Sequence, residues 1–355
     1  MDQFIGTMPV AEKQRFDVAR LEAYLFAHVD GFSGRLEVEQ FKGGQSNPTY
    51  RLAAGGRRYV MRTKPAPAVK LLRSAHAVER EFRVISALAG AGIPVPRTYA
   101  LCEDEGVIGR AFYIMDCVEG RILWDQTLPG MSRGERSAIY DEMNRVIAAL
   151  HLVDFEAVGL ADFGRPGNYF ARQMGRWIKQ YQASETEKIE AMDNLIAWLP
   201  DNIPVGEEIT IVHGDYRLDN LIFHPTEPRI LAILDWELST LGHPLADFSY
   251  HCMSWHLAPG ASRGIGGLDL GSLGIPAEAE YVAAYCRRTG RARIDNWDFY
   301  LAYNMFRLAG ILQGIKKRAE DGTAASEHAL DTGKRARPMA ELGWKYAQKV
   351  MAAGK

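Results

Sequence analysis

The chain has 355 residues, of which 47% are hydrophobic and 24% are charged, with a formal net charge of −2 and a pI near 6.5. These values are typical of a globular protein, and the nearly balanced charge lacks the basic footprint of a nucleic-acid-binding protein. A chain of this length exceeds what one hydrophobic core usually organises, so two lobes are expected.

The chain also lacks the marks of export and of membrane insertion. Four scattered cysteines form no C-x-x-C pair, which favours free thiols in a reducing compartment. The first residues, MDQFIG, have neither the basic nor the apolar segment of a secretion signal, and no apolar run reaches about 18 residues. We therefore expect a soluble, cytoplasmic protein without a membrane span.

The first third of the chain is rich in strand patterns. In chain order we expect a helix at 17–29, strands at 36–42, 49–52 and 58–62, a helix at 75–90, and strands at 99–102 and 111–117. The strands are short and joined by tight turns, as in an antiparallel sheet. Residues 1–117 are therefore predicted to form a small sheet lobe with an opening helix.

Residues 118–355 have the pattern of a larger helical lobe. A capping box, Ser132 to Glu135, opens a long helix. Further helices are expected at about 168–199, 276–289, 295–320 and 324–352, and the Gly- and Ser-rich stretch 259–275 is typical of a loop. One island of short strands interrupts the helices, at 209–212, 220–223 and 230–234.

The strand island contains an ordered set of polar residues. Its sequence places His213, Asp215 and Asn220 in an H-x-D-x-x-x-x-N pattern, and Asp235 follows the next apolar strand. Phosphoryl transfer needs oxygen ligands for metal ions that bridge the phosphates, and a carboxylate that orients the attacking hydroxyl. The spacing therefore predicts a base at Asp215 and metal ligands at Asn220 and Asp235.

This pattern resembles the aminoglycoside phosphotransferase and choline kinase-like superfamily over about residues 30–320. The resemblance implies an α+β, protein-kinase-like fold with a small antiparallel-sheet N-lobe and a larger helical C-lobe. It also implies ATP, with GTP as the alternative, and Mg²⁺. Asp215 corresponds to the catalytic aspartate, Asn220 and Asp235 to the metal ligands, and His213 to a structural residue of the loop.

The first lobe would supply the nucleotide contacts. The turn between the first two strands stands where the family has its phosphate-covering loop, with Gly43, Gly44, Ser46 and Asn47 as contacts. Arg62 occupies the position of the protein-kinase lysine, and its guanidinium can grip phosphates in a bidentate manner. Its ion-pair partner would be Glu81 on the following helix, with Glu79 and Lys64 as solvated competitors.

The strand at 111–117 would end in the hinge that holds the adenine. Backbone groups of Asp116 and Val118 would bind the ring, and Met115 would be the gatekeeper. An ordinary core strand predicts the same sequence, so this assignment depends on the order of elements alone.

Two further groups of residues imitate functional motifs. Asp162-Phe163-Gly164 spells the protein-kinase triplet but precedes the catalytic loop, which is the wrong order. His243, Asp247, His251 and His256 are spaced like metal ligands on one helix, but Asp247 resembles the family's structural aspartate, expected to anchor the catalytic loop by hydrogen bonds.

The acceptor is less defined by the sequence than the chemistry. The motifs look most like the kinase-like domain of certain acyl-CoA dehydrogenase family members, which implies a hydroxylated acyl or other lipid-derived small molecule. Arg217 would suit an anionic acceptor or the transferring phosphate. The aromatic side chains Tyr250, Trp255, Tyr303 and Phe306 form either an acceptor pocket or helix core.

Three alternatives remain open from the sequence: an aminoglycoside or amino-alcohol kinase, a non-catalytic nucleotide-binding pseudokinase, and a protein kinase. The intact set of Asp215, Asn220 and Asp235 argues against a pseudokinase. The lack of a long activation segment after Asp235 argues against a protein kinase. The oligomeric state is not encoded in any motif.

Overall fold

The structure, a computed structural model, describes residues 6–42, 47–65, 77–260, 264–323 and 328–353. The chain divides into two compact units. The first consists of Met1–Leu123, Glu156–Phe163 and Asp219–Ser239, and the second of Trp124–Phe155, Gly164–Leu218 and Thr240–Lys355. The assignment of residues 1–117 and 118–355 to two functional lobes stays a prediction.

The first unit is built on a six-stranded, fully antiparallel sheet with the strand order β1-β2-β3-β4-β6-β5. A smaller sheet has the order β10-β9-β7. The elements of this unit are β1 (Thr7–Met8), α1 (Val18–His28), β2 (Glu37–Phe41), β3 (Thr49–Ala54), β4 (Arg57–Thr63), α2 (Val78–Gly90), β5 (Thr98–Cys102), α3 (Glu105–Ile108), β6 (Phe112–Asp116), β7 (Arg121–Ile122), β9 (Leu221–Phe223) and β10 (Ile230–Ile233).

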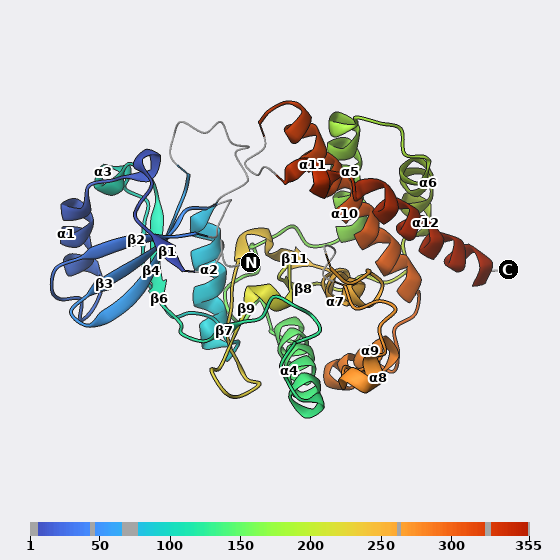
Figure 1. The fold of residues 1–355 in the computed structure, drawn as a ribbon, viewed down its shortest axis with the longest axis horizontal. Coiled ribbons are helices and arrows are strands. Elements are labelled where there is room, and N and C mark those ends of the chain that lie inside the picture. Colours follow the sequence, from blue (N-terminus) through green and yellow to red (C-terminus); the bar gives the residue numbers. More distant parts are fainter. Residues whose placement is uncertain (1–5, 43–46, 66–76, 261–263, 324–327, 354–355) are drawn as a thin grey trace. The chain divides into compact units, whose positions relative to one another are not determined.

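The alternation of side chains along the strands gives the large sheet two different faces. On one face Tyr50 and Leu52 of β3 pack with Leu21 of α1 in the main apolar core. The other face carries Arg62 of β4 and Tyr113 of β6, which are paired in register, and α2 lies on this side (Figure 1). The alternation of side chains along β4 therefore places Arg62 on the face of the sheet that α2 covers.

The predicted strand island does not form one sheet, which corrects the sequence-based interpretation. β9 pairs with both β10 and β7 in the first unit, whereas β8 (Thr210–Val212) pairs with β11 (Thr240–Gly242) in the second. Gly120 explains how β7 reaches β9: a Cβ at this position would lie 2.2 Å from the carbonyl oxygen of Phe223. Only glycine permits this approach of two backbones.

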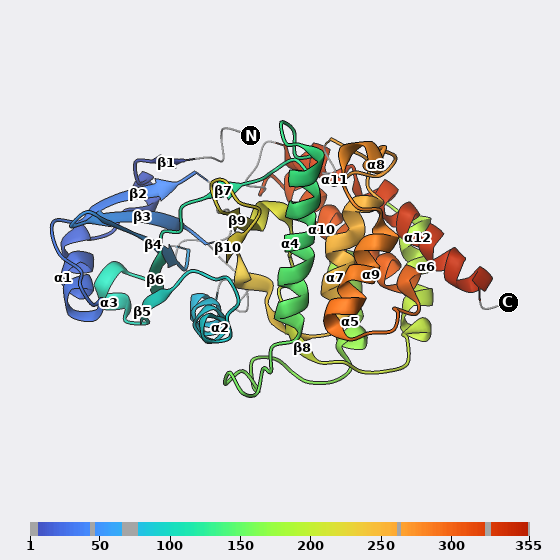
Figure 2. The same cartoon turned by 90° about the horizontal axis from the view of Figure 1, so that it is seen from below.

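The second unit is mainly helical, and Figure 2 shows most of its helices side by side. Ser132 and Glu135 form the predicted capping box at the start of α4. Besides β8 and β11, its elements are α4 (Arg133–His151), α5 (Tyr169–Ser184), α6 (Glu190–Trp198), α7 (Pro244–Cys252), α8 (Leu270–Leu273), α9 (Glu278–Thr289), α10 (Trp297–Glu320), α11 (Ala329–Gly333) and α12 (Ala336–Ala353).

Helix α10 is the centre of this unit. It packs against α5, α7, α11 and α12, and it is buried on most of its sides. Gln313 of α10 also explains why the helix predicted at 168–199 is broken into α5 and α6: its amide donates to the carbonyl oxygen of Ser184 at 2.9 Å and to the hydroxyl of Thr186 at 2.8 Å. A neighbouring helix thus binds the last carbonyl of α5.

The predicted α+β class is confirmed, with an antiparallel sheet followed by a helical part. One predicted helix and one predicted loop differ in detail. The stretch at 324–352 forms α11 and α12 within its described part, and the loop at 259–275 contains the short helix α8. Among the helices that the structure describes, none is both long and apolar enough to cross a membrane.

A buried histidine gives the second unit a predictable response to acid. Burial lowers the pKa of His251 to about 4, and its Nε2 contacts the hydroxyl of Tyr281 at 2.8 Å. Below pH 6.5 the unfolded chain binds a proton that the folded chain refuses, so stability falls toward pH 4 by up to about 1.4 kcal/mol per pH unit. Urea unfolding of His251→Asn should show a shallower pH dependence than the parent, and the exposed control His28→Asn should keep the parental slope. Equal slopes in all three proteins would contradict the assignment.

Candidate active site

The guanidinium of Arg62 in the first unit lies among three carboxylates, at 12% side-chain exposure. Its Nε forms an ion pair with Oε2 of Glu81 at 2.8 Å, and its Nη2 donates to Oδ1 of Asp235 at 2.7 Å. A third carboxylate, Glu237, lies 3.4 Å from the same Nη2. The predicted Arg62–Glu81 ion pair is therefore present, and it is part of a larger cluster.

Glu81 is held in place from two sides. Its side chain is 1% exposed, accepts a hydrogen bond from Nδ2 of Asn47 at 2.7 Å, and accepts another from the hydroxyl of Tyr113 at 3.2 Å. Burial raises the pKa of the Glu81 carboxyl, and the charge of Arg62 opposes that rise. Asn47 therefore acts on the helix glutamate in this structure, in addition to its predicted place in the phosphate-covering loop.

Asp235 and Asn220 lie at adjoining ends of β10 and β9. The backbone N–H of Leu234 donates to the carbonyl oxygen of Asn220 at 2.8 Å. Asp235 itself has a φ of 65°, in the left-handed region that non-glycine residues rarely occupy. Such strain concentrates at functional sites, because the surrounding structure must hold it.

The donor set at this position suits a hard cation. Asn220 offers an amide oxygen and Asp235 a carboxylate, the kinds of ligand that Mg²⁺ accepts while it keeps several waters. Within the part of the chain that the structure describes, no three His, Cys, Asp or Glu side chains gather to hold a metal ion. The residues therefore fit a metal that arrives with a polyphosphate and takes few protein ligands, rather than a resident metal in a protein cage.

The remaining predicted nucleotide residues are placed less completely. Gly43, Gly44 and Ser46 lie outside the described residues. Met115 is buried on β6 at 7% exposure, and the Asp116 carboxylate accepts a hydrogen bond from the hydroxyl of Tyr99. Val118 follows β6 and is half-buried. Their roles in binding an adenine ring stay predictions.

The predicted base belongs to the second unit. Asp215 lies in the turn after β8, where the Tyr250 hydroxyl donates to its Oδ1 at 2.7 Å and Nε of Arg217 lies 3.1 Å from the same oxygen. Burial raises the pKa of Tyr250, and the negative charge of Asp215 raises it further. The phenol therefore stays protonated and orients the carboxylate of Asp215.

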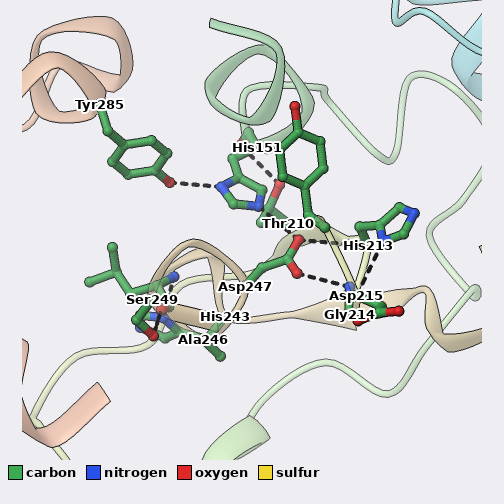
Figure 3. A network of polar contacts seen from close by, with 12 residues as sticks. His151, Thr210, His213, Gly214, Asp215, His243, Ala246, Asp247, Ser249 and Tyr285 are labelled. Carbon is green, nitrogen blue, oxygen red and sulfur yellow. Dashed lines mark hydrogen bonds and ion pairs between the residues drawn. The ribbon is translucent and has the colours of Figure 1, made fainter. Parts of the chain in front are cut away.

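Asp247 anchors the turn that carries Asp215 (Figure 3). Its two carboxylate oxygens accept the backbone N–H of His213 at 2.7 Å and of Gly214 at 2.8 Å. His151 contacts the same carboxylate through Nε2 at 3.2 Å, and the Tyr285 hydroxyl contacts Nδ1 of His151 at 2.7 Å. The anchoring predicted for Asp247 is confirmed.

The electrostatics of this anchor favour a charged carboxylate. Burial alone would raise the pKa of Asp247, but hydrogen bonds and the nearby imidazoles of His151 and His213 hold it below its usual range. His213 also accepts the backbone N–H of Asp215 through Nδ1 at 3.2 Å. The turn is thus fixed by side chains that do not need to touch a substrate.

Sequence reasoning assigned no role to Glu237 and did not anticipate the Tyr250 contact. Glu237 lies two residues after Asp235, and that short spacing was the available signal. Tyr250 lies three residues after the anchor Asp247 on α7, and that spacing is a weaker sequence signal. Trp255, Tyr303 and Phe306 are buried, so the structure favours helix core over an open acceptor pocket for these three.

The kinase-like triplet has a different role from the one it spells. In the first unit, Arg83 of α2 pairs with the carboxylate of Asp162, and Arg80 donates to the carbonyl oxygen of Phe163 at 2.6 Å. The Arg80 guanidinium also lies 4.2 Å from the centroid of the Phe163 ring. These contacts tether the helix that carries Glu81.

Residues 37–303 match the model of the phosphotransferase enzyme family. A curated relative from Mus musculus, acyl-CoA dehydrogenase family member 10, is 47% identical over 347 residues, which are 97% of this chain and 32% of the relative. The chain thus spans about a third of the length of that relative.

Solved structures share the fold. A Ralstonia eutropha protein provisionally named an aminoglycoside phosphotransferase is 65% identical, with a TM-score of 0.88 over 94% of this chain and 99% of that one. A spectinomycin phosphotransferase, in complex with ADP and spectinomycin, is 12% identical, with a TM-score of 0.62 over 94% of this chain and 100% of that one. The predicted kinase-like fold is confirmed.

Because Asp247 anchors the turn through both carboxylate oxygens, replacing one of these oxygens should lower the stability of the protein strongly. Asp247→Asn replaces an accepting oxygen by an NH₂ group among buried donors, so the free energy of unfolding should fall by about 2–5 kcal/mol. Urea unfolding measures the loss. The control Asp141→Asn removes an exposed ion pair with Arg288 and should cost less than about 1 kcal/mol. Similar small losses for both variants would rule out the anchoring role.

Proposed function

Because the chain belongs to the phosphotransferase enzyme family and has a kinase-like fold, we propose that it transfers the γ-phosphate of a nucleotide to a hydroxyl group of a small molecule. The observation that carries this proposal is the Arg62 cluster. The guanidinium of Arg62, the expected phosphate clamp, contacts both its helix partner Glu81 and the expected metal ligand Asp235.

The nucleotide is ATP in this proposal, with GTP as the alternative. Support comes from the ADP bound to the spectinomycin phosphotransferase of the same fold. Arg62 would grip the phosphates, while Asp116 and Val118 would bind the adenine through their backbones beside Met115. Gly43, Gly44, Ser46 and Asn47 would cover the phosphates.

Asn220 and Asp235 would hold Mg²⁺ together with the phosphate oxygens. The metal supplies charge neutralisation for the crowded phosphates when it is bound. The strained backbone of Asp235 fixes its carboxylate next to Arg62. Asp235 and Arg62 already contact each other. Nucleotide binding would therefore add Mg²⁺ as a new partner for Asp235 and the phosphates as a new partner for Arg62.

Asp215 would orient the acceptor hydroxyl and accept its proton. In this step the O–H bond of the acceptor breaks, a bond from its oxygen to the γ-phosphorus forms, and the bond from that phosphorus to the β-phosphate oxygen breaks, which releases the nucleoside diphosphate. Tyr250 and the Asp247 anchor would hold Asp215 in position. Arg217, at 3.1 Å from Asp215, would contact the acceptor or the transferring phosphate.

For the acceptor we propose a hydroxylated acyl or other lipid-derived metabolite. The support is the identity with acyl-CoA dehydrogenase family member 10 across nearly all of this chain. An aminoglycoside or amino-alcohol acceptor is the competing candidate. The other alternative is a non-catalytic nucleotide-binding protein. Nucleotide hydrolysis with and without a panel of hydroxylated metabolites separates the three.

All four cysteines are free thiols. We accordingly propose a reducing compartment, the cytoplasm, as the place where this reaction occurs, and a small molecule rather than a nucleic acid as the partner.

The assignment of Asp215 as the base predicts a loss of turnover without a loss of nucleotide affinity. Asp215→Asn should keep the parental nucleotide affinity, measured by calorimetry, and lose turnover by about 10²- to 10⁴-fold, because proton acceptance is removed while the binding groups remain. The exposed Asp201→Asn serves as the control and should match the parent. Unchanged turnover of Asp215→Asn with a confirmed acceptor would refute the role.

The clamp assignment predicts coupled losses. Arg62→Ala and Glu81→Ala should each weaken Mg-nucleotide binding, and the double variant should lose less than the sum, with a coupling of about 0.5–3 kcal/mol. Arg62→Lys should recover part of the affinity, since an ammonium is a point charge where a planar fork was used. Strictly additive losses would mean that the two residues do not act as one unit.

A further inference from the structure

A buried arginine in the second unit, Arg307, lies near the carboxylate of Asp215 but forms no direct ion pair with it. Arg307 of α10 is 9% exposed, and it makes no ion pair with any residue that the structure describes. Among the described residues, its guanidinium forms one hydrogen bond, from Nη2 to the carbonyl oxygen of Gly214 at 2.8 Å. Arg307 is therefore a buried cation directly beside the turn that carries Asp215.

The surroundings of this guanidinium are aromatic. Its Cζ lies 5.0 Å from the centroid of the Tyr250 ring and 5.6 Å from that of Trp177 on α5. Burial lowers the pKa of Arg307, but Tyr303, the other nearby tyrosines and the negative charge of Asp215 raise it, and the net shift is upward. The group stays charged, although a buried cation is costly unless an anion or several hydrogen bonds compensate it.

A second unused donor lies next to Arg307. The indole Nε1 of Trp177 is buried and has no hydrogen-bond partner among the described residues, although a buried indole N–H usually finds one. An arginine has five N–H donors, and the described residues use only one of those of Arg307. Two neighbouring side chains thus keep donors in excess at the same place.

The helix that carries Trp177 is cationic throughout. Residues 169–184 of α5 contain Arg172, Arg176 and Lys179 at helical spacing on one face, and no aspartate or glutamate. The Arg176 guanidinium lies 5.6 Å from the centroid of the Trp177 ring. An anion that approaches Arg307 along α5 would therefore meet positive charge, whereas a polycation would be repelled.

We propose that Arg307 and the Trp177 N–H form an anion-binding subsite, so that the acceptor is a hydroxylated small-molecule anion. This inference rests on the proposed phosphotransfer at Asp215. The carboxylate or phosphate group of the acceptor would accept the unused donors, which presents its hydroxyl to the neighbouring Asp215. Arg307 is then a specificity-determining residue, and cationic aminoglycosides and amino alcohols are poor acceptors.

The test uses hydroxy acids of three to six carbons, with diols and amino alcohols of the same lengths as matched probes. Each probe is measured twice with the full chain, by calorimetric binding and by release of nucleoside diphosphate. We expect the hydroxy acids to bind and react best. Arg307→Gln should raise KM for a hydroxy acid about 10- to 100-fold, as for the loss of hydrogen bonds to a charged group, and should change KM for the diol little.

Three further variants separate recognition from a merely structural role. Arg307→Lys should restore part of the preference for hydroxy acids, and Trp177→Phe, which keeps the ring but loses the N–H, should weaken hydroxy-acid binding about three- to tenfold. Arg318→Gln removes an exposed arginine of the same helix and should match the parent. A structural role would instead lower kcat and thermal stability for all acceptors alike.

The outcomes also distinguish this inference from the proposed function. Arg307-dependent binding of hydroxy acids without any phosphoryl transfer would support the subsite and overturn the proposed activity. Transfer to diols or amino alcohols that is as efficient as transfer to hydroxy acids, or unaltered hydroxy-acid binding in both Arg307→Gln and Trp177→Phe, would overturn the subsite while leaving the activity in place. Absence of hydroxy-acid binding to the parent protein would overturn it as well.

Discussion

The need to neutralise one buried guanidinium organises the first unit. Arg62 lies on the helix-covered face of the sheet, where a lone cation would be costly, and carboxylates from two other segments surround it. Glu81 requires α2 to lie against β4, and Asp235 requires the end of β10 to reach the same point. The tether from Arg80 and Arg83 to residues 162–163 holds the same helix from outside. A single charge thus makes the positions of three segments interdependent.

In the second unit a buried negative charge, the carboxylate of Asp247, holds neighbouring segments in position. Asp247 is a fully buried carboxylate whose oxygens bind consecutive backbone N–H groups of the turn that carries Asp215. A backbone turn is soft because its amides have no regular partners, and a buried carboxylate is one of the few groups that can satisfy two of them at once. His151 and Tyr285 continue the contacts to α4 and α9. The position of Asp215 is therefore decided by helices that take no part in its chemistry.

The two charged centres differ in what remains for a ligand. Around Arg62 the acidic groups outnumber the cation, so the cluster suits the arrival of a metal ion with its phosphates. Around Arg307 the donors exceed the acceptors, and the neighbouring helix α5 adds only positive charge. In the proposed function, the side chains around Arg62 in the first unit would serve a nucleotide with its cation, and those around Arg307 in the second unit would serve an anionic acceptor. The ligand class proposed for each unit is therefore based on the excess of acidic groups around Arg62 and of hydrogen-bond donors around Arg307, more than on the shape of either site.

How much could be read in advance differs between local and long-range features. Periodicity alone located the strands of the large sheet except the two-residue β1, and most long helices, because alternation and helical spacing are encoded within a few residues. The spacing of Asp215 and Asn220 and the apolar strand before Asp235 indicated a phosphotransferase, since the needs of phosphoryl transfer limit which side chains can follow one another, while the roles of the three residues stay predictions. The Arg62–Glu81 pair was also predictable, because it follows from a strand and the next helix along the chain.

Tertiary structure alone decided the partners that are far apart in sequence. Strands of three residues such as β8 and β9 are too short to show which sheet they join, so the predicted island divided between two sheets. The break after Ser184 depends on Gln313, a side chain more than 120 residues later that binds the end of α5. Arg307 looks in the sequence like any charge on a long helix, and only its burial beside the turn that carries Asp215, without a direct ion pair, reveals its significance. Local pattern determines which residues become helix or strand, whereas the choice of partners for a buried charge depends on packing that no local pattern contains.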